Sequence, residues 1–315
     1  MIVHAYDIEF LHRTAAPEGR DDCHGWCFGL PPGIRPEQWP LDPISGYPLM
    51  HGFTLRLPED YRCHGPEIVA LSFFSTAVDQ NDGGARVRQP LYEAVVGSGG
   101  APGDEELMPF HAAARSAHPR LHRMKDILDY EYAVILLTEE EFAGPFCPPP
   151  QPSASPLLRA NDRPGWLASG ALSYFEYTGV AKNFAELDGH YLKPLFGSYP
   201  DGTLAWNQEI RSIPRPRDPN AGKAPMEDFG SGTTSGYVSD FYWADGIIKT
   251  ENYRVHDWAE GHKPDHIGGT MRPVQAVPKF SPYYIGFEEY FGGYNFGTGN
   301  AQLDFRDMKF DWACG

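Results

Sequence analysis

The chain has 315 residues, and its 42 acidic side chains outnumber the 26 basic ones, which gives a formal net charge of −16 at pH 7. Its 34 glycines and 30 prolines argue against a helical bundle, a coiled coil or a doubly wound parallel sheet, because both residues interrupt helices. The acidic excess argues against nucleic-acid binding, because phosphates require a basic surface.

The first part of the chain contains three predicted strands. Residues 2–11 alternate moderately between apolar and polar side chains, whereas the proline-rich residues 12–48 predict a long loop. The segment GFTLRLP at 52–58 has the period of two that is typical of a half-buried strand. EIVALSFFS at 67–75 is apolar enough for a more buried strand.

The best helix prediction covers residues 105–128. This segment is rich in Ala, Leu, Glu and Arg, and Asp104 is a suitable N-cap. Pro109 and Pro119 lie inside it, so we expect the helix to be divided into short pieces.

A strand and a short helix are predicted to follow. DYEYAVILL at 129–137 has the composition of a strand. Residues 138–142 predict a short helix, because Thr138 and Glu141 have the spacing of a capping box.

A proline-rich segment, FCPPPQPSASP at 146–156, cannot join a sheet ladder and predicts an extended linker or surface strap. It separates an N-terminal half, residues 1–145, from a C-terminal half, residues 157–315. We expect the two halves to form one compact unit.

Strands and turns also dominate the predictions for the C-terminal half. ALSYFEYTG at 171–179 predicts an aromatic strand, and residues 214–236 predict a long loop. Residues 236–258 contain two strand-like runs with a turn at Asp245-Gly246. Together these patterns predict an α+β fold dominated by a sheet of many short antiparallel strands with a few helices.

The chain has no predicted membrane segment. Its longest apolar runs, residues 68–78 and 132–137, are shorter than the ~20 residues that span a bilayer. The first residues lack the basic start and apolar run of a secretion signal, so we expect a cytoplasmic protein. Five cysteines are few and odd in number, which argues against a disulfide framework.

One distinctive motif is LPPGIRPEQWPLDPISGYPLMHGFTLRL at 30–57. It combines a proline-rich entry, the pair Trp39-Pro40, and a turn with Gly46 and Pro48 that leads into the strand predicted at 52–58. A second motif is HIGGTMRPVQ at 266–275, with His266, Gly268, Gly269 and Gln275.

These two motifs resemble those of the YwqG-like family, bacterial relatives of the TYPP chaperones. The glycine-rich turn and strand FGTGNAQLDF at 296–305 resembles the closing hairpin of that family. The resemblance does not extend over residues 80–165. It implies a sheet-rich α+β fold with an internally duplicated core.

A duplication is also suggested by GYPLMHGFTLRL and GGTMRPVQAV, which each pair a glycine turn with an alternating segment. The alternative is chance recurrence in a glycine-rich chain. We expect the motif residues to have structural roles more often than ligand-binding ones. Gly268 and Gly269 would provide positive φ, and Trp39 would be a rigid apolar anchor.

One cluster has the residue types of a zinc site. Cys23, His24 and Cys27 have the close spacing of zinc ligands, and Cys63 with His64 would complete a tetrahedron. Such a site would be structural rather than catalytic. The alternative is that these residues are free thiols and imidazoles spread along a loop.

No sequence motif predicts catalysis, and we assign no catalytic residue. Paired carboxylates such as Glu59-Asp60 and Glu288-Glu289 are typical of solvated surface charge. The sequence lacks GxSxG, HExxH and phosphate-binding loop motifs.

The resemblance implies a non-catalytic protein-binding module. Members of the YwqG-like family occur beside secreted bacterial toxins, and the TYPP chaperones escort a ribosomal protein. A net charge of −16 favours a basic partner. We therefore predict an immunity protein that binds a basic toxin, with residues 76–104 and 214–236 as candidate contact loops.

The alternative prediction is a carbohydrate-active enzyme or carbohydrate-binding protein. The last third of the chain is crowded with tyrosine, phenylalanine and tryptophan, and aromatic faces with nearby carboxylates are typical of sugar-binding sites. Burial of these rings in a sheet core is the other interpretation.

Overall fold

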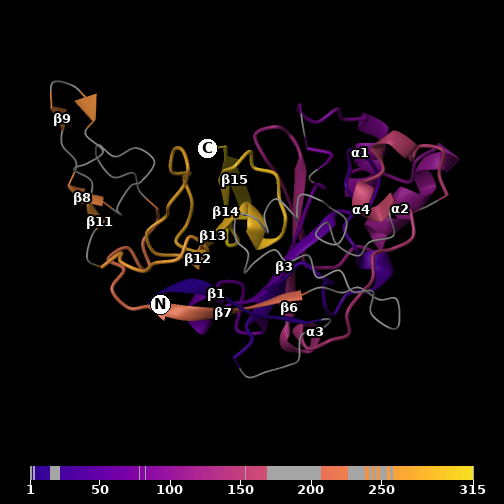
Figure 1. Cartoon of the computed structure of the whole chain (residues 1–315). Coiled ribbons are helices and arrows are strands. Elements are labelled where there is room, and N and C mark those ends of the chain that lie inside the picture. Colours follow the sequence, from indigo (N-terminus) through magenta and orange to yellow (C-terminus); the bar gives the residue numbers. More distant parts are fainter. Residues whose placement is uncertain are drawn as a thin grey trace.

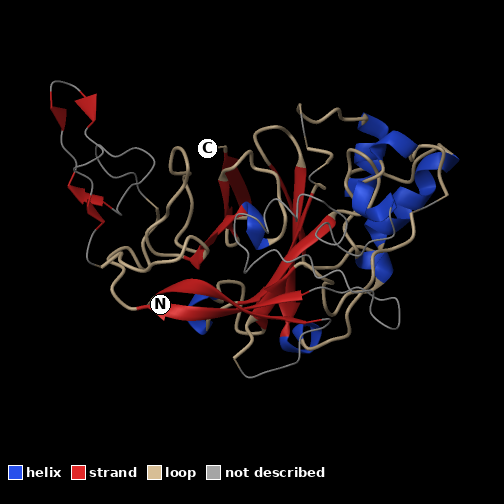
Figure 2. Ribbon diagram, viewed as in Figure 1, coloured by secondary structure: helices blue, strands red, loops and turns tan. Residues whose placement is uncertain are grey.

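The computed structural model describes most of the chain, namely residues 2, 4–14, 22–77, 79–81, 83–152, 154–168, 207–225, 238–240, 243–244, 247–248, 254–255 and 258–314. Within these ranges, eleven strands form one sheet in which all neighbouring strands are antiparallel. Figures 1 and 2 show this sheet through the middle of the molecule.

The sheet combines strands from both halves of the chain. Its strands in chain order are β1 (Ala5–Thr14), β2 (Gly25–Cys27), β3 (Met50–Arg56), β4 (Ile68–Ser75), β5 (Leu121–Lys125), β6 (Glu131–Thr138), β7 (Asn207–Arg215), β12 (His266–Ile267), β13 (Tyr284–Glu288), β14 (Asn300–Asp304) and β15 (Lys309–Ala313). Two further strand pairs join β8 (Val238–Asp240) to β11 (Arg254–Val255) and β9 (Trp243–Ala244) to β10 (Ile247–Ile248).

The helices are short. The α-helices are α1 (Gln89–Val96), α2 (Met108–Arg115), α3 (Glu139–Phe142) and α4 (Gly165–Ala168). The 3₁₀ turns are η1 (Pro36–Gln38), η2 (Glu59–Tyr61), η3 (Glu105–Leu107), η4 (Ala160–Asp162) and η7 (Glu289–Phe291). Helices α1, α2 and α4 gather on one side of the molecule (Figure 2). No helix within the described ranges combines the length and apolar character needed to cross a bilayer.

Ten of the eleven strands are arranged symmetrically about the boundary between β1 and β7. The order is β15-β14-β13-β12-β1-β7-β2-β3-β4-β6-β5, so β1 and β7 are adjacent at the middle and each is followed outward by strands of the other half. Outward from this boundary, β1 corresponds to β7, β12 to β2, β13 to β3, β14 to β4 and β15 to β6, and β5 is left without a counterpart. The two halves are therefore interlocked in one sheet.

Local geometry supports this correspondence. β2 is followed by two residues in the left-handed region, Phe28 (φ 63°) and Gly29 (φ 64°), and β12 is followed by Gly268 (φ 60°) and Gly269 (φ 80°). The N–H of Phe28 donates to Gly52 O at 2.7 Å, and the N–H of Gly268 donates in the same way to Tyr284 O at 2.8 Å. In each half, a short strand (β2 or β12) is followed directly by two residues with left-handed backbone conformation.

This geometry corrects the predicted alignment of the repeat. We expected a strand after the glycines of GGTMRPVQAV, but the structure has no strand between Ile267 and Tyr284. The segment that matches Gly268-Gly269 is Phe28-Gly29. The predicted alignment was wrong because Phe28 adopts a positive φ. Such a conformation is uncommon for residues other than glycine, so nothing in the sequence indicated it.

Apolar side chains cover both faces of the sheet. Along β4, Leu71 and Phe73 belong to the larger core cluster, whereas Ala70 and Phe74 belong to a second cluster on the other face. All eight residues of β4 are buried, which explains its nearly continuous apolar sequence.

The predicted sheet-dominated α+β fold is confirmed. Strands occur as expected in the predicted segments 2–11, 52–58, 67–75 and 129–137. The capping box at residues 138–142 is also confirmed, because Thr138 and Glu141 make both of its reciprocal hydrogen bonds. The strand predicted at 171–179 lies outside the described residues.

The long helix predicted at 105–128 is wrong beyond Arg115. Asp104 does cap η3, and Pro109 lies in the first turn of α2 rather than interrupting it. After Pro119 the chain forms β5, which pairs with β6 and buries Met124 in the larger core. Pairing with the apolar β6 overrides the helical composition of this segment.

The predicted linker at 146–156 begins against the N-terminal half. Phe146 pairs with Pro32 in an isolated antiparallel bridge, and the N–H of Cys147 donates to Pro31 O at 2.9 Å. Further along, Ser155 Oγ donates to Glu106 O at 3.0 Å. The segment is therefore held along the surface of this half.

Candidate functional site

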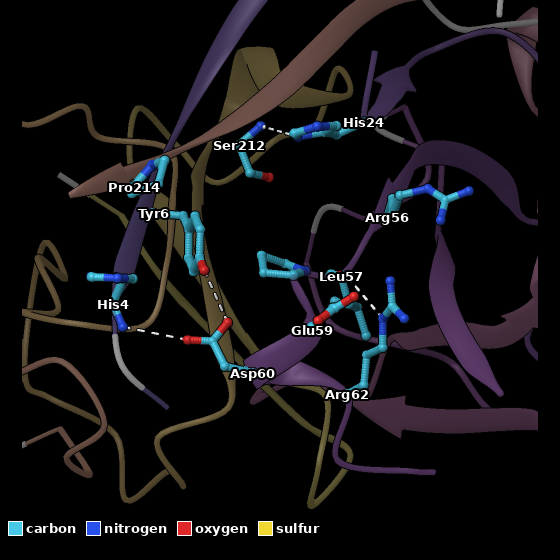
Figure 3. A pocket seen from close by; sticks show the side chains of 11 residues that line it. His4, Tyr6, His24, Arg56, Leu57, Glu59, Asp60, Arg62, Ser212 and Pro214 are labelled. Carbon is cyan, nitrogen blue, oxygen red and sulfur yellow. Dashed lines mark hydrogen bonds between the residues drawn. The ribbon is translucent and has the colours of Figure 1, made fainter. Parts of the chain in front are cut away.

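A cleft of about 560 Å³ lies where the ends of β1, β2, β3 and β7 meet the η2 turn. Figure 3 shows its side chains from close by. We call it the β1–β7 cleft. It is lined by His4, Tyr6, His24, Arg56, Leu57, Pro58, Glu59, Asp60, Arg62, Ser212 and Pro214.

The η2 turn positions the acidic wall of the cleft. Pro58 precedes the turn, and Tyr61 within it is fully buried and donates its hydroxyl to His4 O at 3.1 Å. This anchor fixes the turn against the start of β1. Asp60 therefore faces β1, whereas Glu59 is exposed at the rim.

Tyr6 and Asp60 form a hydrogen-bonded pair inside the cleft. Tyr6 Oη donates to Asp60 Oδ1 at 3.0 Å, and the N–H of His4 donates to Asp60 Oδ2 at 3.4 Å. Burial and the Asp60 carboxylate raise the pKa of Tyr6 to about 12. The Tyr6 hydroxyl is therefore protonated at neutral pH and is held as a donor.

His24 and Ser212 lie on the opposite wall (Figure 3). The N–H of Ser212 donates to His24 Nδ1 at 2.9 Å, so the neutral imidazole carries its proton on Nε2. Burial and the nearby Arg56 lower the pKa of His24. Ser212 is 7% exposed, and its Oγ makes no hydrogen bond to any described residue.

Of the two arginines in the cleft, Arg56 is paired with a carboxylate and Arg62 is bonded to a backbone carbonyl. Arg56 forms a two-pronged ion pair with Glu139 of α3, with Nη1 to Oε2 at 2.8 Å, and its guanidinium stacks 4.6 Å from the Phe142 ring centroid. Arg62 Nε donates to Leu57 O at 3.3 Å. Arg62 also lowers the pKa of Glu139, together with the stronger effect of Arg56.

The charged residues that line the cleft balance one another. Arg56 and Arg62 contribute two positive charges, and Glu59 and Asp60 contribute two negative ones, while Glu139 lies outside the lining and pairs with Arg56. The cleft therefore combines an anionic rim with hydrogen-bonding groups that its own backbone already orients. Such a preformed polar cleft is suited to recognising a charged ligand.

Three of the predicted zinc ligands lie on or beside β2, but they point to different surroundings. Cys27 is buried, and its Sγ donates to Gln208 O at 3.7 Å. Cys23 Sγ donates to Gly25 O at 3.3 Å, whereas His24 lines the cleft.

The other two predicted ligands lie elsewhere. His64 Nε2 is 2.6 Å from Phe305 O, and the Cys63 side chain packs against the larger core. Burial raises the pKa of the Cys63 thiol to about 11, which disfavours a thiolate. Across the described ranges, no group of three or more such side chains is arranged to hold a metal ion, so the predicted tetrahedron is not assembled.

The first family-like motif forms a closed loop. Trp39 is buried and donates its indole Nε1–H to Leu49 O at 2.8 Å. The N–H of Leu49 donates to Pro40 O at 2.9 Å, and Leu41 pairs with Pro48. These contacts are those expected if Trp39 is a structural anchor.

Gly46 lies at the tip of this loop with a φ of 83°. A Cβ at this position would press on the Phe110 ring and on the Leu158 side chain. The glycine therefore allows close packing of the loop against α2.

The second motif begins with a buried histidine. His266 Nδ1 lies 2.8 Å from Gly268 O, and its ring packs edge-on against Tyr284. Gly268 approaches so closely that an added Cβ would overlap the Tyr61 hydroxyl. Because Tyr61 anchors the η2 turn, this motif indirectly supports the β1–β7 cleft.

The other two residues of the second motif differ in burial, because Gly269 is buried and Gln275 is exposed. Gly269 packs against Ala5 and the buried Asp218, and a Cβ would overlap both. Gln275 is exposed, and its Nε2 donates to Cys314 O at 3.0 Å. None of the eight motif residues lines the cleft.

Sequence reasoning identified only part of the cleft. Glu59-Asp60 stood out as a carboxylate pair and His24 as a metal candidate, but Tyr6 and Ser212 carried no signal. These two residues are brought together only by the pairing of β1 with β7. No local pattern reports a pairing between strands about 200 positions apart.

Comparisons of the chain with protein-family models, with curated proteins and with solved structures give no match. The resemblance to the YwqG-like family therefore stays a prediction that rests on the two motifs.

Proposed function

We propose that this protein is a non-catalytic binding module that recognises a basic protein, and that it acts as an immunity protein against a toxin. The proposal rests mainly on one observation: the charged side chains of the β1–β7 cleft are fixed by their own chain, whereas the Glu59 carboxylate is exposed at the rim. Fixed polar groups lose little conformational entropy on binding, which favours recognition.

The internal contacts of the cleft support binding rather than turnover. Asp60 accepts the Tyr6 hydroxyl, His24 accepts the Ser212 N–H, and Arg56 is paired with Glu139. Each of these hydrogen bonds orients a group, and the Ser212 hydroxyl makes no hydrogen bond to the His24 ring that could activate it as a nucleophile. The Tyr6 hydroxyl, for example, is held in its protonated form.

The net charge supports a basic partner. At −16, the chain attracts a cationic protein over long range, and complementary charge accelerates association. The predicted contact segment at 76–104 includes helix α1 (Gln89–Val96) and is therefore not a loop throughout. It contains the exposed Glu93 and Asp104 and is followed by the exposed Glu105 and Glu106. We propose these carboxylates as a second acidic contact region, apart from the cleft.

The test is a calorimetric titration with purified proteins from the reading frames beside this gene. We expect one basic toxin domain to bind tightly and to lose activity in the complex. Glu59→Lys should weaken binding at least tenfold, which corresponds to about 1.4 kcal/mol. The matched control is Glu67→Lys, an exposed glutamate that does not line the cleft. If no neighbouring protein binds, or if both variants weaken binding equally, the proposal fails.

A carbohydrate ligand is the second candidate. The adjacent carboxylates of Glu59 and Asp60 lie in the same cleft as the Tyr6 ring, which is the combination this alternative requires. Tyr6 is the only aromatic ring among the described lining residues apart from the histidines, so the stacking surface is small. Binding on a glycan array that is lost in Tyr6→Ala would favour this alternative.

A further inference from the structure

The polar groups of the β1–β7 cleft are arranged in two sets. Asp60 and Glu59 form one side near the η2 turn, and the His24 ring and Ser212 form the other, with the Tyr6 ring between them (Figure 3). The first set offers negative charge. The second offers a hydrogen-bond donor, His24 Nε2, beside a hydroxyl.

Ser212 is the group that most needs a partner. Its Oγ is inaccessible to solvent and makes no hydrogen bond to the described residues, although the side chain borders the cleft. Buried hydroxyls are nearly always hydrogen-bonded, because an unpaired one destabilises the folded protein. A ligand in the cleft would supply the missing partner when a small movement of the neighbouring side chains uncovers the Oγ.

The apolar part of the lining fits a flexible chain of methylene groups. Leu57, Pro58 and Pro214 are the apolar residues of the cleft, and the Tyr6 ring adds an aromatic surface. A side chain with an apolar stem and a charged end can pack its stem on such a wall and place its charge at the rim.

We propose that the cleft binds a lysine side chain of the partner protein. Its stem lies along Tyr6 and Pro58, and its ammonium is shared by Asp60 and Glu59. The peptide group of the same segment hydrogen-bonds to His24 Nε2 and Ser212 Oγ. This inference rests on the proposed function, because it names the part of the basic partner that enters the cleft.

The size of the cleft agrees with a short peptide segment. Its volume of about 560 Å³ lies within the usual range of about 300–1,000 Å³ for ligand pockets and exceeds the needs of one side chain. Neighbouring residues of the segment can therefore enter with the lysine. Arg56 is paired with Glu139, so it repels the ammonium less than a free arginine would, and Arg62 is the other cation in the lining.

The test uses the whole protein with three blocked tripeptides, acetyl-Gly-Lys-Gly-amide and its norleucine and glutamate counterparts. Ring signals of His24 and Tyr6 are followed by NMR during each titration. We expect the lysine peptide to shift both rings and the other two peptides to shift neither. Glu59→Gln should weaken lysine-peptide binding about three- to tenfold, whereas Glu67→Gln should not change it.

A second variant tests the hydrogen-bonding side. Ser212→Ala should weaken lysine-peptide binding while the unfolding midpoint in urea stays within the error of the parent protein. Equal shifts with norleucine, binding of the glutamate peptide, or an unchanged affinity in both Glu59→Gln and Ser212→Ala would overturn the inference. Toxin binding without lysine-peptide binding would reject the lysine site but leave the proposed function standing.

Discussion

Trp312 of β15 donates its indole Nε1–H to Asp126 Oδ2 at 2.8 Å, across 186 positions of the chain. The same carboxylate accepts the N–H groups of Leu128 and Tyr130 in the turn between β5 and β6. β5 and β15 are the two edge strands of the sheet. One aspartate therefore ties both edges together and curls the sheet around the larger core.

We expect Asp126→Ala to destabilise the protein more than Trp312→Phe. The tryptophan change removes one hydrogen bond to a charged group, which costs about 1.5–3 kcal/mol. The aspartate change also frees the turn donors and the Tyr132 hydroxyl, which donates to Asp126 Oδ2 at 3.1 Å. Urea unfolding of both variants measures the difference. Equal destabilisation would show that the turn hydrogen bonds contribute nothing beyond the indole contact.

Gly268→Ala should destabilise the protein through both its backbone and its neighbour. Alanine at a positive φ costs about 1–2 kcal/mol, and its Cβ would overlap the Tyr61 hydroxyl. The control is Gly261→Ala, which has a similar φ of 80° but open space around the added Cβ. The unfolding free energy should fall further at 268 than at 261.

A double variant separates the two effects. Tyr61→Phe removes the hydroxyl that the new Cβ would meet, so Gly268→Ala should be less costly in that background. If the cost is the same in both backgrounds, the hydroxyl is not the cause, and the Tyr61 ring carbons that lie 2.7 and 2.9 Å from the added Cβ remain in phenylalanine.

The sequence predicted the parts of the fold that local pattern determines. β4 was visible because both of its faces are buried, and α3 because Thr138 and Glu141 form their capping box within four residues. β5 was missed because its pairing with β6 determines its conformation, and its composition favours helix.

The cleft was much less predictable than the fold. Tyr6, Asp60 and Ser212 belong to segments that meet only after β1 pairs with β7 and Tyr61 anchors the η2 turn. The zinc prediction grouped His24 with cysteines that are near it in sequence, but its hydrogen-bond partner is Ser212. Sequence spacing predicts a side-chain contact only when both residues belong to the same helix, strand or turn.

Stability should fall as the pH decreases below 6.5, because His51 and His266 are buried. Burial lowers the pKa of each to about 3, so the unfolded chain binds protons that the folded chain does not. The contribution is complete above pH 6.5 and is lost toward pH 3, by about 1.4 kcal/mol per pH unit for each histidine. Urea unfolding at pH 7.0 and 5.5 measures the slope.

The histidine origin of this slope is tested by substitution. In His51→Gln, which retains polar contacts to Gly29 O and Thr54 Oγ1, the slope should decrease relative to the parent protein. An unchanged slope in both His51→Gln and His266→Gln would assign the pH dependence to other groups, such as carboxylates or His24 and His118, whose pKa values burial also lowers.

Arg215→Met should be among the most destabilising single changes in this protein. The Arg215 side chain is fully buried and donates to Asp7 Oδ1 at 2.6 Å and to Asp218 Oδ2 at 3.2 Å. Removing the guanidinium leaves two carboxylates without their shared cation, and breaking a buried pair in this way costs about 3–5 kcal/mol. The control is Arg211→Met, because Arg211 pairs with Glu9 at 3.1 Å but both side chains are about one-third exposed. An exposed pair contributes at most about 1 kcal/mol, so equal losses of unfolding free energy in the two variants would contradict the predicted importance of burial.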